Sequence, residues 1–203
     1  MPHNCRVTDQ LSLSIWLERG SRANRVKYFE KLLRLFPFSQ RPEQGQSTVT
    51  VQGVSVTEPP LLENPMNGPI DATQVLDVLA DYSGDDIAYV VESWWDLWQY
   101  EADWKLAPAR VQISCFGPHF DNGTERLAGD QEDLRIDFGV DSRYLPRLDL
   151  AGSARMTESN IKSMLRLVHE LDSALPVAKR KLETESGENF ADRLQQVLSS
   201  SQS

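Results

Sequence analysis

Alternating apolar and polar residues predict most of the strands. In residues 11–17, leucine and isoleucine occupy every second position, with serine and tryptophan between them. This period of two is typical of a strand with one buried face. The runs that carry it are 11–17, 86–100, 109–116 and 134–140. A further strand is predicted over 49–56, where the alternation changes phase at Gly53; we interpret the change as a bulge rather than a tight hairpin.

Apolar residues spaced three and four apart predict the helices. One helix is expected over 21–36, between a serine that can cap it and a proline that ends it. A shorter helix is expected over 71–81, opened by a capping box. Thr157 is expected to cap the helix with the widest apolar face, to which Ile161, Met164, Leu165, Val168, Leu171 and Leu175 contribute.

The C-terminal part of the chain is predicted to be helical as well. Pro176 can open a second helix, which Gly187 interrupts. Phe190, Leu194 and Leu198 predict a last short helix. Residues 58–69 contain four prolines and are expected to form an irregular connection.

Together these elements predict an α+β fold with the order β-α-β-α-β-β-β-α-α. The three consecutive strands favour a mainly antiparallel sheet of about five strands, with the helices packed on one face. We expect residues 1–198 to form a single α+β domain and residues 199–203 a flexible tail.

Charge is distributed unevenly along the chain, whose net charge is −9. Residues 1–41 carry eight Lys or Arg against three Asp or Glu, whereas residues 42–104 carry twelve Asp or Glu and no basic residue. One interpretation is that the basic first helix packs near the acidic middle and compensates it. The other is that the middle offers a negative surface to a basic partner. Phosphate repels carboxylates, so nucleic-acid binding by this segment is disfavoured.

Four of the five tryptophans fall in a single stretch of eleven residues, 94–104, which covers the end of the strand predicted over 86–100. Alternation sends these side chains to both faces of a sheet, and helices can cover only one. The other face would then expose aromatic area, and Trp and Tyr are preferred anchors at interfaces. The predicted partner-binding residues, carboxylates included, are Glu92, Trp94, Trp95, Asp96, Trp98, Tyr100 and Trp104.

No catalytic motif stands out, and no cofactor is expected. The three histidines lie far apart, and Cys115 alternates with Val111 and Ile113 as a core residue would. The enzymatic alternative is a small divalent-cation-dependent enzyme that uses carboxylates of residues 92–141, above all Asp133, Asp137 and Asp141 with Glu92 or Asp96. Arg135 lies between two of these aspartates and offers them a simpler partner.

The sequence therefore favours a non-catalytic interaction protein of the adaptor, inhibitor or immunity type. Its expected partner is a basic protein, or a second copy held through the aromatic side chains. The longest apolar run has five residues and no secretory signal is visible, so we expect a cytoplasmic protein that binds neither membrane nor nucleic acid.

Overall fold

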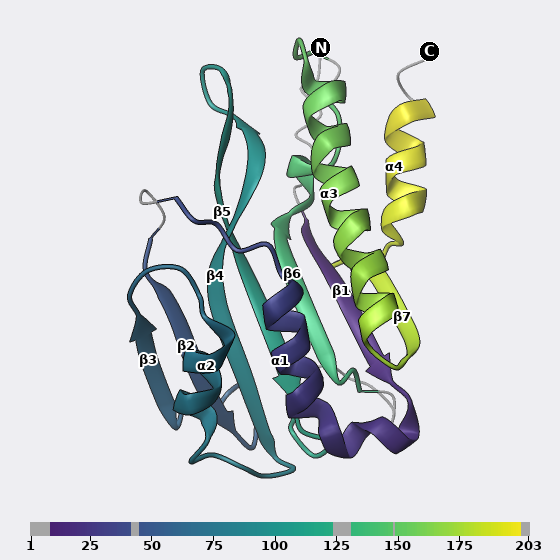
Figure 1. The fold of residues 1–203 in the computed structure, drawn as a ribbon. Coiled ribbons are helices and arrows are strands. Elements are labelled where there is room, and N and C mark those ends of the chain that lie inside the picture. The colour runs from purple at the N-terminus through teal and green to yellow at the C-terminus, as the bar shows by residue number, and fades with distance from the viewer. Residues whose placement is uncertain (1–8, 42–44, 124–130, 148, 200–203) are drawn as a thin grey trace.

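The computed structural model describes residues 9–41, 45–123, 131–147 and 149–199, and a seven-stranded antiparallel sheet runs through them (Figure 1). From one edge to the other the strands are β3 (Leu62–Met66), β2 (Ser47–Gly53), β4 (Ile87–Tyr100), β5 (Trp104–Phe116), β6 (Leu134–Val140), β1 (Gln10–Leu17) and β7 (Val177–Thr184). The α+β class and the antiparallel sheet are confirmed, but the sheet has seven strands rather than about five.

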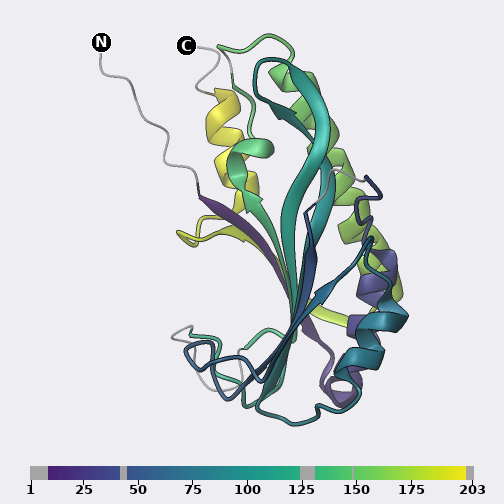
Figure 2. The same cartoon turned by 90° about the vertical axis from the view of Figure 1, so that its left-hand side faces the viewer.

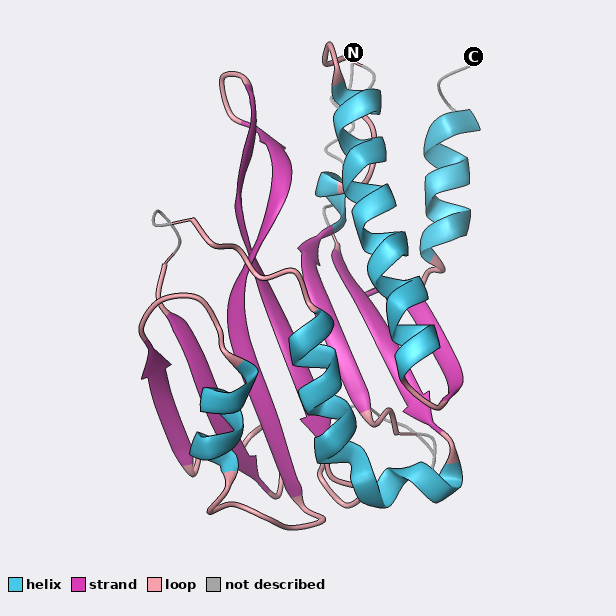
Figure 3. Ribbon diagram, in the orientation of Figure 1, coloured by secondary structure: helices cyan, strands magenta, loops and turns pink. Residues whose placement is uncertain are grey.

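Three helices cover one face of the sheet (Figures 1 and 3). They are α1 (Arg25–Leu35), α2 (Ala72–Leu79) and α3 (Ser153–Ala174); a 3-10 turn, η1 (Arg19–Asn24), precedes α1. The last helix, α4 (Phe190–Ser199), lies at the upper end of the sheet (Figure 2), and its Phe190 packs against Tyr144 within the same hydrophobic core, with ring centroids 6.3 Å apart.

The period-two strands place their apolar side chains under the helices as expected. Leu11, Leu13 and Ile15 of β1 are fully buried, and the odd-numbered residues of β4 and β5 extend the same core. The opposite face carries short polar side chains such as Ser12 and Ser114. We call this second, largely polar side the open face.

Two strands were not predicted. β3 lies inside the proline-rich connection 58–69, and it pairs with β2 although it contains Pro65. Proline is tolerated because β3 is an edge strand, so its nitrogen points away from the ladder. β7 replaces the helix predicted after Pro176: residues 177–184 pair with β1 along their whole length. The order of elements differs from the prediction for these two reasons.

The long helix begins earlier than its sequence suggested. α3 starts at Ser153 after Gly152, whose φ is +78°, and Thr157 lies inside it, where its hydroxyl donates to the Ser153 carbonyl. Val168 is buried as expected, but Leu165 points to solvent with 53% of its surface exposed. The expected tail also begins later, because Ser199 belongs to α4; residues 200–203 lie outside the described part.

β4 and β5 form a hairpin that extends beyond the rest of the sheet (Figure 1). β2 pairs with β4 only as far as Glu92, and β6 pairs with β5 only from Gln112 onward. Residues 93–111 therefore form a projecting hairpin, which we call the ribbon; beside it, Phe38 and Ser39 pair with β4 only at Trp94 and Trp95. Pro108, predicted to precede the second strand, lies within it opposite Asp96.

Candidate functional site

The ribbon divides the tryptophan cluster between its two faces. Trp95 points toward the helices and is 3% exposed. Its indole packs against Phe36 and Phe138, with ring centroids 5.5 and 5.8 Å away. Trp95 was predicted to bind a partner, but it belongs to the core and is not available to one.

The other aromatic residues lie on the outer face of the ribbon. The register sets Trp98 opposite Leu106 and Tyr100 opposite Trp104, so the four side chains form one patch, which we call the aromatic block. Trp98 and Trp104 are half-buried, whereas Tyr100 and Leu106 are 41% and 37% exposed. The most exposed side chains of the block are therefore Tyr100 and Leu106, and not a tryptophan as expected.

The block has a fixed shape. The rings of Tyr100 and Trp104 lie 5.4 Å apart, and the Trp104 indole N–H donates to the Ala151 carbonyl at 2.8 Å. This bond ties the tip of the hairpin to the segment that leads into α3. A preorganised aromatic surface loses little conformational entropy when a partner covers it.

Trp94 is on the same outer face but is partly covered by residue 45. A Cβ added at Gly45 would lie 2.6 Å from Trp94 Cζ2, so the backbone there rests on the indole ring. Trp94 is half-buried, and its N–H is buried without a partner among the described residues. Trp94 therefore borders the aromatic block without forming part of its exposed surface.

The carboxylates predicted to make this surface acidic are all paired. Glu92 forms an ion pair with Arg110 across the hairpin. Asp96 accepts a hydrogen bond from the Ser39 hydroxyl at 2.7 Å and lies 3.3 Å from the Arg41 guanidinium. The patch therefore carries little net charge of its own.

The basic N-terminal segment supplies part of this compensation, as one interpretation of the charge pattern predicted. Arg41 reaches Asp96, and Arg25 reaches Asp85 at 3.5 Å. At the tip of the hairpin, Lys105 pairs with Glu101. A count along the sequence could not reveal these pairs, because each depends on strand register or on a helix packed beside the sheet.

The three aspartates of the enzymatic alternative do not converge. Asp133 accepts a hydrogen bond from the Leu17 N–H at 2.8 Å, and Asp141, at the start of the 3-10 turn η2 (Asp141–Arg143), lies 2.6 Å from Arg193. Asp137 accepts from Arg135 at 2.9 Å. Among the residues that the structure describes, no three or more His, Cys, Asp or Glu are grouped so as to hold a metal ion.

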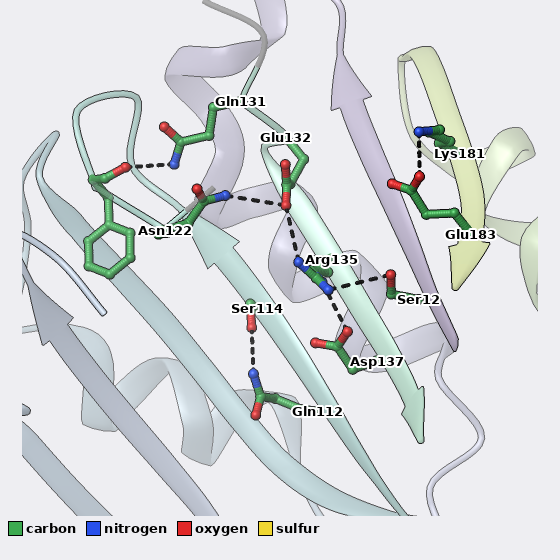
Figure 4. Close-up of polar contacts among 12 residues, drawn as sticks. Ser12, Gln112, Ser114, Asn122, Gln131, Glu132, Arg135, Asp137, Lys181 and Glu183 are labelled. Atoms are coloured by element: carbon green, nitrogen blue, oxygen red, sulfur yellow. Dashed lines mark hydrogen bonds and ion pairs between the residues drawn. The ribbon is translucent and has the colours of Figure 1, made fainter. Parts of the chain in front are cut away.

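Arg135 joins the polar groups of the open face (Figure 4). Its guanidinium lies between Asp137 and Glu132 and reaches toward the Ser12 hydroxyl of β1. Glu132 also accepts a hydrogen bond from Asn122, and its side chain is fully buried. The pairing of Arg135 with Asp137 is confirmed, whereas Glu132 was missed because nothing in the sequence marks it as buried.

We expect Asp137→Asn to raise the melting temperature at pH 7. Burial raises the pKa of the Asp137 carboxyl, and the opposing effect of Arg135 is smaller. Because the pKa is higher in the folded than in the unfolded chain, stability falls as the pH rises through the two values. The difference in melting temperature between Asp137→Asn and the unchanged protein should therefore vanish below pH 3.8, the ordinary aspartate pKa. Thermal unfolding at several pH values measures this, with the exposed Asp149→Asn as control; a lower melting temperature at pH 7 would contradict it.

Cys115 is a core residue, as predicted. It is fully buried, and burial raises the pKa of its thiol to about 12. The reactive thiolate is therefore not formed at neutral pH. Cys5 lies outside the described residues.

No family model matches this chain, and no curated protein or solved structure shows significant similarity to it. None of the described helices has the length and apolar character needed to cross a membrane.

Proposed function

We propose that the protein is a non-catalytic binding protein that holds a protein partner against the outer face of the ribbon, as an adaptor or inhibitor would. The observation that carries the proposal is the aromatic block. Trp98, Tyr100, Trp104 and Leu106 form one patch on a projecting hairpin, and two of them keep more than a third of their surface exposed. Large aromatic side chains in one patch are the usual anchors of protein interfaces.

The surroundings of the block resemble the rim of an interface. Ion pairs lie around it, including Lys105 with Glu101 and Arg147 with Asp149. Asp149 raises the pKa of Arg147. This pair lies in the segment that continues to Ala151, whose carbonyl accepts the Trp104 indole N–H, so the pair borders the block. An apolar centre with a polar, charge-balanced rim is the common anatomy of such surfaces.

The charge distribution indicates that different features of the protein control the association and the dissociation of a partner. The net charge of −9 favours the approach of a basic partner over long distances. Paired carboxylates at the contact contribute little further attraction. We therefore expect salt to slow association, and the aromatic block to set the rate of dissociation.

The test compares three immobilised proteins for the partners they retain from the cells in which the chain is made. They are the unchanged protein, the double variant Tyr100→Ser/Leu106→Ser, and the control Leu165→Ser, which removes an apolar side chain of similar exposure on α3. We expect a protein that the first and the third retain in high salt and the double variant loses.

Two outcomes would contradict the proposal, and a further measurement identifies the partner. A partner that the double variant retains as well as the unchanged protein, or that salt alone releases, contradicts it. Sedimentation of the purified proteins shows whether the partner is a second copy: a dimer that Tyr100→Ser/Leu106→Ser dissociates would identify the partner as this chain itself.

A further inference from the structure

β7 is an edge strand, and no other strand of the described sheet pairs with its outer side. The Glu185 N–H donates to the Gln10 carbonyl at 2.8 Å, so alternate residues from there, including Lys181 and Lys179, bond to β1. The residues between them, Arg180 and Leu182, direct their N–H and C=O groups away from the sheet. In the described part of the chain no backbone group bonds to the N–H and C=O of Arg180 or to the N–H of Leu182, whereas the bridge between Glu183 and Asn189 brings the Phe190 N–H to the Leu182 carbonyl.

The two edges of the sheet differ in how they are closed. On β3 the residue at the corresponding outward position is Pro65, which has no N–H to offer. β7 contains no proline, and only its far end is closed, where the Thr184 N–H donates to the Glu188 carbonyl and Glu183 bridges to Asn189. β7 therefore keeps an uninterrupted row of outward N–H groups, whereas on β3 Glu63 faces outward but the next outward position is Pro65.

The open part of β7 is basic. Lys179, Arg180 and Lys181 follow one another, and the side chains of Arg180 and Lys181 are 49% and 47% exposed. Arg180 pairs with the partly exposed Asp172 and Lys181 with the nearly buried Glu183, and each cation keeps about half of its own side chain open to a further carboxylate. A second copy paired antiparallel about Arg180 would set cation against cation, so this edge selects against self-pairing.

We propose that the outer edge of β7 binds an extended acidic segment of a partner protein, which adds to the sheet as an eighth strand. The free N–H and C=O of Arg180 and the free N–H of Leu182 supply the backbone hydrogen bonds, and the three cations supply the preference for glutamate or aspartate. This edge is formed by other residues than the ribbon, so the proposal does not depend on the function proposed above.

The test uses a synthetic eight-residue peptide of alternating glutamate and valine, and a second in which lysine replaces glutamate. Amide hydrogen exchange is followed at Arg180 and Leu182, with Lys179 and Lys181 as internal references already bonded to β1. In the free protein we expect the two outward amides to exchange much faster than the references. At ten times the dissociation constant of the acidic peptide, they should slow by about tenfold.

Two variants distinguish the contribution of the backbone hydrogen bonds to peptide binding from that of the side-chain charge. Arg180→Pro removes the outward N–H but no bond of the β1–β7 ladder, so it should fold and should no longer bind the acidic peptide. Arg180→Glu keeps the backbone and should prefer the lysine peptide. The proposal is overturned if the outward amides are already protected in the free protein, if both peptides bind equally well, or if Arg180→Pro binds as the unchanged protein does.

Discussion

Asn160→Ala is expected to lower the free energy of unfolding by about 3–5 kcal/mol, because it leaves three buried backbone groups unpaired. The Asn160 side chain, 2% exposed on α3, accepts from the Trp98 N–H at 2.9 Å and donates to the Trp98 and Arg143 carbonyls. Asn160 thus supplies the hydrogen bonds that a neighbouring strand would give β4 at Trp98, beyond the end of β2. It also joins α3 to the ribbon and to η2.

Denaturant unfolding of three variants tests this role. Asn160→Asp keeps the acceptor for the Trp98 N–H but turns a charged oxygen toward two carbonyls, so we expect it to be as destabilising as alanine. Ser163→Ala removes an exposed hydroxyl from the same helix and should change stability by less than about 0.5 kcal/mol. If Asn160→Ala unfolds like the Ser163 variant, the ribbon does not depend on α3.

Trp95→Ala is expected to cost about 3–5 kcal/mol, because it removes a fully packed aromatic side chain from the core. Trp98→Ala, three residues along the same strand and on the other face, should cost clearly less, since its indole is only half-buried. Denaturant unfolding of the pair therefore measures which tryptophan is structural. Equal losses, or a larger loss for Trp98, would contradict the division of the cluster between core and surface.

The fold was predictable where one face of an element is buried and the other is not. β4 and β6 alternate cleanly because the helices cover only one side of them. β1 alternates in sequence as well, although both of its faces are buried. The Asp71 cap of α2 was also predictable, and its carboxylate accepts from the Thr73 N–H at 2.7 Å.

Both edge strands were hidden because an edge strand needs no apolar alternation. Pro65 in β3 argued against a strand, yet at an edge its missing N–H costs no ladder bond. The Lys-Arg-Lys run in β7 is solvent-exposed on a strand with one neighbour, so its sequence resembles a polar helix or loop. Only pairing with β1, more than 150 residues away along the chain, fixes its conformation.

The site was predictable in its aromatic part and not in its charges. Alternation alone places Trp95 on one face of β4 and Trp94 and Trp98 on the other. The sequence could not tell which face lies under the helices. The charge pattern indicated that the basic N-terminal segment could compensate the acidic middle, but not that Arg41 would pair with Asp96 or Arg110 with Glu92, because each pair depends on the fold. Asn160 was missed because a buried asparagine on a helix leaves no periodic signal.

The most direct test of the proposed function is photo-crosslinking from the ribbon to the partner. Benzoylphenylalanine is placed at position 106 in the aromatic block, or at position 165 on α3, since both native leucines are exposed. We expect a crosslink to the captured partner, or to a second copy of the chain, from position 106 and none from position 165. A crosslink from position 165 alone, or none from position 106 while the partner remains bound, would contradict the assignment of the ribbon as the binding surface.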